Sequence, residues 1–247
     1  MPLEQEIRSL AVILPIFNEC SMVEETVNAV SAFAARNPHY YFLFMDDGSN
    51  DGTAENLREA ISRQGNNAIA CYHHARNQGK GAAIRTGFSM VEADALCFMD
   101  ADLAYSLEHL KQMEEKLRTA DVVIGSRKLE AEIARPSLRR HILGESFNRL
   151  SRLILNLPFK DTQAGLKGFR RQAARRLFEK SRFDGFGFDV ELLFLARKWG
   201  MKITELPARV NDRHSYKKGK LKLMKDSTIM FLNLLLIRWR DITGGYG

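Results

Sequence analysis

The sequence predicts an α/β protein, with a mostly parallel β-sheet covered by helices on both faces. Short apolar runs alternate with segments of helical periodicity through the first half of the chain, a pattern typical of right-handed β-α-β units. Polar residues follow the ends of several of these runs, and ligands of such sheets bind beyond the carboxyl ends of the strands. The 247 residues, 45% hydrophobic and 27% charged, suffice for one large globular domain.

The first half is expected to contain five strands with helices between them. The first strand ends at Pro15, and Ser21 is then expected to cap a helix, with Glu24 completing a capping box. The expected strands are residues 10–14, 40–45, 68–74, 95–99 and 122–124. The other expected helices are residues 53–63, 81–91 and 106–118.

The second half is expected to be more helical and more basic. We expect helices at 136–157, 172–179, 188–199 and 221–240, and strands at 166–169 and 203–206. The predicted organisation is one domain, residues 1–212, made of halves 1–126 and 127–212. A basic amphipathic helical segment, 213–247, is predicted to follow it.

Charge is distributed unevenly along the chain. The formal net charge is +7, but residues 1–124 carry −8 and residues 125–247 carry +15, so the two halves are expected to meet different partners. Three cysteines without metal-ligand spacing, and no signal peptide pattern, favour a reducing cytoplasmic setting. The longest apolar stretch, 229–237, contains Asn233 and is short of the roughly 20 residues that span a bilayer.

Asp100 and Asp102 follow the predicted strand 95–99. Two carboxylates one residue apart at a strand end can hold one hard cation, and Mg²⁺ commonly takes one or two carboxylates together with substrate phosphates. The alternative is that one of them caps the helix that follows.

Two further loops of the first half carry polar residues suited to a ligand. Residues 47–52 resemble the start of a calcium loop, but Arg58 stands where the bidentate Glu is required. What remains is a turn in which Asp47 either binds a sugar or base or forms a local turn. Lys80 lies between two glycines at an expected helix start, a position that favours anions.

Basic residues of the second half are candidates for binding an anion. No zinc-finger, RNP or helix-turn-helix pattern accompanies them, so an anionic substrate or membrane surface fits better than nucleic acid. The candidates are Arg127, Arg139, Arg140, Arg213, Lys217, Lys218, Lys220 and Lys222.

Five motifs occur in a characteristic order: AVILPIFNE (11–19), DDGSNDGT (46–53), NQGKGAA (77–83), DADL (100–103) and GSR (125–127). Together they resemble the family 2 inverting glycosyltransferases of the GT-A fold. This resemblance implies that Asp100 and Asp102 hold Mg²⁺ or Mn²⁺ on the donor pyrophosphate. It also implies a nucleotide-sugar pocket that includes Pro15, Asn18, Glu19, Asp47, Lys80 and Asp100.

Three motifs of the second half are similar to the polyprenyl-phosphate (dolichyl-phosphate) branch of that family: DTQAGLKGF (161–169), FDVELL (188–193) and ELPARV (205–210). Glucosyl members usually have Cys and Phe where this chain has Ala164 and Leu166, so the sugar stays open. We expect this chain to differ from many bacterial members in having no C-terminal transmembrane helices.

The resemblance implies metal-dependent, inverting transfer of a hexose, glucose or mannose, to a polyprenyl or dolichyl phosphate. UDP-glucose is the favoured donor, and GDP-mannose is also possible. A phosphate monoester is already anionic at pH 7, so the site must chiefly bring two anions together. The expected acceptor-binding residues are Arg127, Arg139, Arg140, Gln163, Arg213, Lys217 and Lys218. The expected catalytic residues are Asp100, Asp102, Asp161, Arg127, Arg140 and Arg213.

Several alternatives stay open at this point. A hydroxyl acceptor would need a general base, for which Asp161, Asp189 and Glu191 are candidates. A non-catalytic peripheral membrane or nucleotide-binding protein, or a nucleic-acid binder, could share the charge pattern. The helices 136–157 and 221–240 could lie on a membrane surface, as expected for a peripheral protein, or pack on the core.

Overall fold

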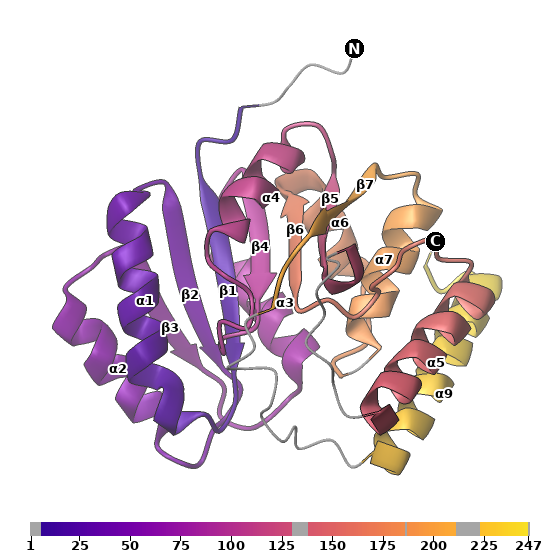
Figure 1. Ribbon diagram of the computed structural model, residues 1–247, viewed down its shortest axis with the longest axis horizontal. Helices are drawn as coiled ribbons and strands as arrows, with labels where there is room; N and C mark the ends of the chain where they lie inside the picture. Colours follow the sequence, from indigo (N-terminus) through magenta and orange to yellow (C-terminus); the bar gives the residue numbers. More distant parts are fainter. Residues whose placement is uncertain (1–5, 130–137, 186, 211–222, 247) are drawn as a thin grey trace.

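The computed structural model describes residues 6–129, 138–185, 187–210 and 223–246. Its centre is a seven-stranded sheet in the order β3-β2-β1-β4-β6-β5-β7 (Figure 1). The strands are β1 (Leu10–Ile16), β2 (Tyr40–Asp46), β3 (Ile69–His73), β4 (Ala95–Met99), β5 (Val122–Ser126), β6 (Leu166–Arg170) and β7 (Ile203–Pro207). Among the described strands, β6 alone runs antiparallel to its neighbours, β4 and β5, so the predicted mostly parallel sheet is confirmed.

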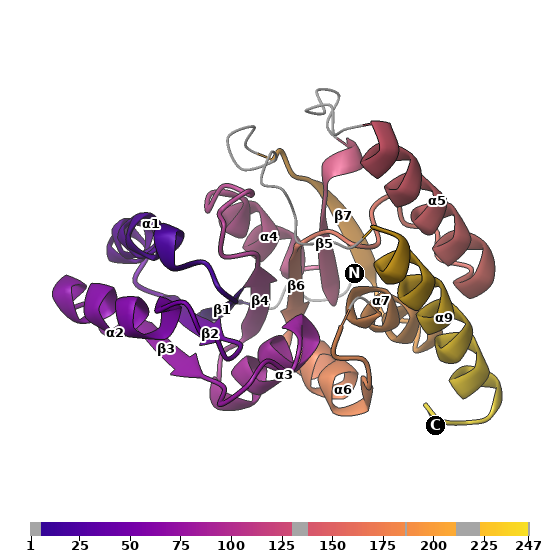
Figure 2. The ribbon, with the colours of Figure 1, turned by 90° about the horizontal axis from the view of Figure 1, so that it is seen from below.

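Helices cover both faces of the sheet, as Figure 2 shows from below. They are α1 (Val23–Arg36), α2 (Thr53–Gln64), α3 (Lys80–Met90), α4 (His109–Leu117), α5 (Leu138–Leu155), α6 (Arg171–Lys180), α7 (Phe188–Lys198) and α9 (Leu223–Ile242). Two short 3₁₀ helices are η1 (Cys20–Met22) and η2 (Arg127–Leu129).

The strand β1 shows how the two faces are filled. Val12 and Leu14 pack with the apolar residues of α1, α2 and α4, whereas Ala11 and Ile13 pack with those of α3, α6 and α7. Because both faces are buried, the strand is a continuous apolar run and does not alternate with polar residues.

The predicted cap of the first helix is wrong. Met22, not Ser21, precedes α1, and no side chain caps the helix. The chain enters through η1, where the amide of Glu19 donates to Thr53 Oγ1 (3.0 Å) and the amide of Cys20 donates to Asp51 Oδ2 (3.2 Å). The loop after β2 therefore satisfies the amides that precede α1.

The helices α5 and α9 lie side by side at one end of the molecule (Figures 1 and 2). In α9, Leu234 and Ile237 are fully buried in the core that includes α7. The predicted boundary at 212–213 stays a prediction, because residues 211–222 lie outside the described part of the chain. Within the described residues, no helix is long and apolar enough to cross a membrane.

Candidate active site

A cleft of about 180 Å³ opens at the carboxyl ends of β1 and β4. It brings together four of the residues predicted for the donor and metal, from the end of β1 and the segments that follow β1 and β4. Its lining consists of Pro15, Ile16, Phe17, Glu19, Met22, Asp100, Ala101 and Asp102. The position is the one expected for ligands of an open parallel sheet.

The carboxylate of Asp100 has a cation beside it. Lys80 Nζ, from the start of α3, lies 2.5 Å from Asp100 Oδ1. Burial opposes the charge on Lys80, but Asp100, Asp189 and Asp102 together raise its pKa, so the amine stays protonated at neutral pH. The sequence placed Lys80 and Asp100 in one pocket only through the family resemblance, and it gave no sign of this ion pair.

Gly165 allows the Asp100 carboxylate to lie where it does. The amide of Asp100 donates to Gly165 O at 3.1 Å, and a Cβ on Gly165 would be only 2.0 Å from Asp100 Oδ2. Any side chain here would displace the carboxylate. The sequence contained this glycine within a motif but offered no sign of its contact with Asp100.

Asn18 connects the loops that follow β1 and β2. It adopts a left-handed conformation (φ 53°), its Oδ1 accepts from the amide of Asn50 at 2.9 Å, and its own amide donates to Ser49 Oγ at 2.8 Å. Asn18 therefore holds the loop after β1 against the loop after β2, and in this way it helps to set the shape of the cleft's rim.

Asp47 is buried, with its carboxylate held by the segment that precedes α3. Its Oδ1 accepts from His74 Nδ1 (2.9 Å) and from the amide of Gln78 (3.0 Å), and its Oδ2 accepts from the amide of Gly79 (2.7 Å). Asp47 thus fixes the backbone next to Lys80. The role of His74 was not anticipated from the sequence.

On the other side of the site, Asp161 and Arg127 form a bidentate pair. Arg127 Nε lies 2.7 Å from Asp161 Oδ2, and Nη2 lies 3.0 Å from Oδ1. Burial tends to raise the pKa of Asp161, but the hydrogen bond and charge of Arg127 prevail and lower it. Asp161 is fully buried while the Arg127 side chain is 47% exposed, so the guanidinium presents its charge to solvent from a fixed position.

The loop between Asp161 and β6 is tied to several elements. Thr162 Oγ1 donates to Asn148 Oδ1 of α5 at 2.7 Å. The fully buried Lys167 donates to Asp189 Oδ1 and to Ala164 O, each at 2.6 Å. Gln163, a predicted acceptor residue, is half-buried in this same loop.

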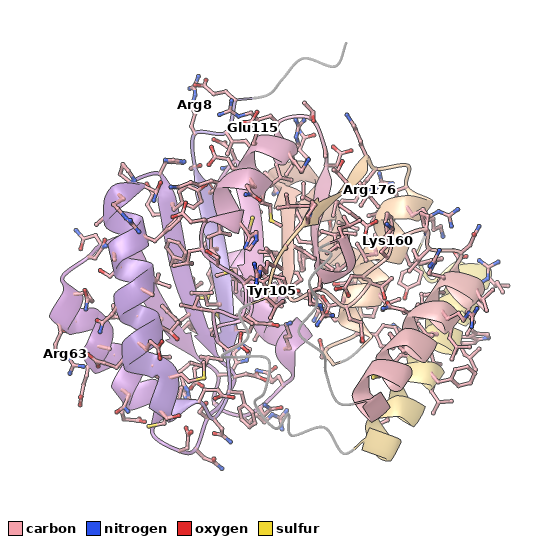
Figure 3. All side chains as sticks on the ribbon, viewed as in Figure 1. Arg8, Arg63, Tyr105, Glu115, Lys160 and Arg176 are labelled. Atoms are coloured by element: carbon pink, nitrogen blue, oxygen red, sulfur yellow. The ribbon has the colours of Figure 1, made fainter. Side chains whose placement is uncertain are left out.

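Tyr105 lies near the middle of the molecule (Figure 3), in the loop that follows Asp102, and was not singled out from the sequence. Burial raises the pKa of its phenol. The charge of Arg127 lowers this pKa, whereas the charges of Asp161 and Asp100 raise it. The phenol is 2% exposed and stays protonated at neutral pH, as a neutral group between the two charged sides of the site.

Other predicted acceptor residues are not tested by the structure. Arg139 and Arg140 lie in α5, but their side chains are outside the described residues. Arg213, Lys217 and Lys218 belong to the segment 211–222, which also lies outside them. Their roles stay predictions.

The three candidate general bases are all engaged. Glu191 is fully buried and accepts from the amides of Arg182 (2.8 Å) and Phe183 (3.0 Å) and from Tyr246 Oη (2.7 Å). Asp161 and Asp189 form the ion pairs described above. Proton abstraction by any of them would cost an existing ion pair or hydrogen bond.

The site's donor set fits a divalent cation that is completed by substrate. Among the described residues, no three His, Cys, Asp or Glu side chains form a ready-made metal site. Asp100 and Asp102 offer carboxylate oxygens at the cleft, and Mg²⁺ characteristically combines one or two carboxylates with water and substrate phosphates.

Comparison with known proteins agrees with this geometry. The family model described as "Glycosyl transferase family 2" matches residues 11–178. The human "Dolichyl-phosphate beta-glucosyltransferase" is 29% identical over 97% of this chain and 78% of its own length. The protein of the same name from Dictyostelium discoideum is 29% identical over 95% of this chain and 75% of its own length.

Among solved structures, glucosyl-3-phosphoglycerate synthase from Mycobacterium tuberculosis, in complex with Mn²⁺, UDP and phosphoglyceric acid, has the same fold. Its TM-score is 0.64 at 15% identity, over 97% of this chain and 79% of that one. The predicted GT-A architecture is thereby confirmed. The chain belongs to glycosyl transferase family 2 and is a glycosyltransferase.

Proposed function

We propose that this protein transfers glucose, with inversion, from UDP-glucose to the phosphate of a polyprenyl or dolichyl phosphate, with Mg²⁺ or Mn²⁺ bound by Asp100 and Asp102. The observation that carries the proposal is the Asp100 carboxylate at the cleft, set between Lys80 and Gly165. The names of the human and Dictyostelium relatives support glucose and dolichyl phosphate.

The donor diphosphate is expected to bind at the Asp100 side of the site. The bound cation would supply positive charge to the leaving diphosphate. Lys80, which the surrounding carboxylates keep protonated, adds a second positive charge there. The loops held by Asn18 and Asp47 keep the walls of this pocket fixed, which limits the reorganisation needed on binding.

The acceptor phosphate is expected on the Arg127 side. Arg127 is held in a single orientation by Asp161 and is half-exposed, so it can contact an anion without a large loss of side-chain entropy. A phosphate acceptor is ionised at neutral pH and needs no protein base. This agrees with the engagement of Asp161, Asp189 and Glu191 in internal contacts.

A membrane surface is the proposed setting for the lipid acceptor. The helix α9 buries Leu234 and Ile237 but leaves other large apolar side chains exposed, as does α5 beside it. These exposed residues are Leu150, Leu153, Ile229, Phe231, Leu232, Leu235, Leu236, Trp239 and Ile242. Arg149, Arg152 and Arg238 are exposed among them, which suits an anionic interface. The protein would then act as a peripheral enzyme on the cytoplasmic face.

A donor and acceptor panel tests the proposal. UDP-glucose and GDP-mannose would each be offered with a short-chain polyprenyl phosphate, and with glycerol or a soluble sugar, in Mg²⁺, Mn²⁺ or EDTA. We expect glucosyl polyprenyl phosphate from UDP-glucose only when metal is present. Transfer to glycerol or sugar but not to lipid phosphate would overturn the proposed acceptor. Product from GDP-mannose alone would overturn the proposed donor.

A further inference from the structure

The backbone of residues 182–184, here called the Phe183 segment, packs against the start of α3. The amide of Gly81 donates to Asp184 O at 2.7 Å, and Arg85 Nη1 lies 2.6 Å from Asp184 Oδ1. A Cβ on Gly79 would be 2.5 Å from Asp184 O, and one on Gly81 would be 2.8 Å from Phe183 O. The two backbones are therefore in direct contact on both sides of Lys80.

The buried carboxylate of Glu191 holds this segment in place. Its Oε2 accepts from the amides of Arg182 and Phe183, and its Oε1 accepts from Tyr246 Oη at 2.7 Å. Glu191 and Tyr246 are 0% and 1% exposed. A buried carboxylate with three donors is a strong and geometrically specific anchor.

The anchor ties this region to α9. Tyr246 follows that helix, and its ring packs beside Phe194 of α7 with ring centroids 6.3 Å apart. The Arg240 guanidinium of α9 lies 5.1 Å from the centre of the Phe183 ring. The helix that carries the exposed apolar side chains thus contacts the same segment that supports α3.

We propose that Glu191 and Tyr246 are positioning residues: through the Phe183 segment they set the start of α3, and with it the placement of Lys80 against Asp100. The packing of α9 against the core then determines how well the cleft binds a nucleoside diphosphate with a divalent cation. This inference rests on the proposed function, which assigns that ligand to the Lys80–Asp100 side of the site. Coupling free energies between distinct sites typically change affinity by about 5–150-fold.

Tyr246→Phe tests the proposal, because it removes one hydroxyl and keeps the aromatic ring. Tyr40→Phe is the matched control: Tyr40 is equally buried, its hydroxyl donates to the carboxylate of Glu114, and it begins β2 at the opposite end of that strand from Asp46 and Asp47. Three quantities are measured in the full chain: the melting temperature, the affinity for UDP in the presence of Mn²⁺, and the exchange rate of the Gly81 amide.

We expect Tyr246→Phe to weaken UDP binding in Mn²⁺ by about fivefold or more and to speed exchange of the Gly81 amide. Tyr40→Phe should lower the melting temperature by a similar amount and change neither of the other quantities. Glu191→Gln should act in the same direction as Tyr246→Phe. Because both changes break one anchor, the double variant should lose less affinity than the product of the two single losses.

The outcomes separate this inference from the proposed function. If the wild-type protein does not bind UDP with Mn²⁺, the proposed donor site fails, and the Gly81 exchange rate still decides whether the anchor reaches α3. If Tyr246→Phe leaves both UDP affinity and Gly81 exchange at wild-type values, the positioning role is overturned. Equal changes in Tyr246→Phe and Tyr40→Phe would also overturn it, since they would show a general loss of stability.

Discussion

The carboxylate of Asp100 lies so close to the backbone of Gly165 that a Cβ there would come within 2.0 Å of Oδ2. The contact joins the end of β4 to the loop that leads into β6, the strand inserted antiparallel between β4 and β5. It places a segment of the acceptor side directly against a proposed metal ligand. The loop before β6 therefore helps to set the position of the Asp100 carboxylate.

Gly165→Ala is expected to displace the Asp100 carboxylate and to reduce turnover by at least about 100-fold, as misplacement of about 1 Å can do. Steady-state kinetics together with a melting curve would measure the effect. Gly185→Ala is the control, because a Cβ there would meet nothing within 4 Å. Near-normal turnover in Gly165→Ala would show that the position of Asp100 is not critical.

Asp102→Ala is expected to abolish metal-dependent turnover while the fold stays intact. Its Oδ1 accepts from the amide of Ala104 at 3.0 Å, so the substitution removes one local hydrogen bond, worth about 0.5–1.5 kcal/mol. The measurement is product formation across a Mn²⁺ titration, with circular dichroism to confirm folding. Glu59→Gln, an exposed change on α2, should leave turnover unchanged. Wild-type rates in Asp102→Ala would contradict the metal assignment.

The Asp161–Arg127 pair predicts a definite dependence of stability on pH. Since Arg127 lowers the pKa of Asp161 in the folded protein, the pair's contribution is fully present above the unfolded pKa of about 3.9. It is lost as the pH falls through the lower, folded pKa. Arg127→Leu leaves the buried carboxylate without its partner and should lower the free energy of unfolding by about 2 kcal/mol at pH 7. This loss is smaller than for a fully buried pair, because Arg127 is half-exposed.

Urea unfolding at pH 7 and at pH 3 measures this effect. The difference between wild type and Arg127→Leu should shrink at the lower pH, because Asp161 in the variant can then be protonated. Arg58→Leu, which breaks an exposed pair with Glu55, should cost no more than about 1 kcal/mol at either pH. A pH-independent difference for Arg127→Leu would contradict the assigned charge state of Asp161.

Replacing Leu235, Leu236 and Trp239 by Ser is expected to abolish flotation with anionic liposomes while leaving the core intact, because all three side chains are exposed. The comparison variant is Tyr41→Ser with Tyr72→Ser, which removes two exposed aromatic residues from β2 and β3. Flotation of the α9 variant at the wild-type level would exclude this face as the membrane contact.

Much of the sheet could be predicted from the sequence, because strands buried on both faces are continuous apolar runs. The D-x-D segment could be placed at the rim because it follows such a run. The hydrogen bonds of Asp47 could not be found by the same reasoning, because the amides of Gln78 and Gly79 are about thirty residues away. The predicted cap by Ser21 is wrong because the chain forms η1 before α1, so that Met22 precedes the helix.

The contact of Gly165 with Asp100 and the anchor of Glu191 on Tyr246 depend on how distant elements pack. The first needs the antiparallel insertion of β6, which a short apolar run does not reveal. The second joins residues 55 positions apart. Local pattern predicts which residues end strands, but not which of them meet.

The most direct test of the proposed reaction is product analysis with UDP-[¹⁴C]glucose and a short-chain polyprenyl phosphate in Mn²⁺. We expect a labelled glucosyl polyprenyl phosphate with the anomeric configuration inverted, and none of it in EDTA or with Asp102→Ala. Label that appears only in glucose or in a glycoside of a hydroxyl acceptor, or a product of retained configuration, would contradict it.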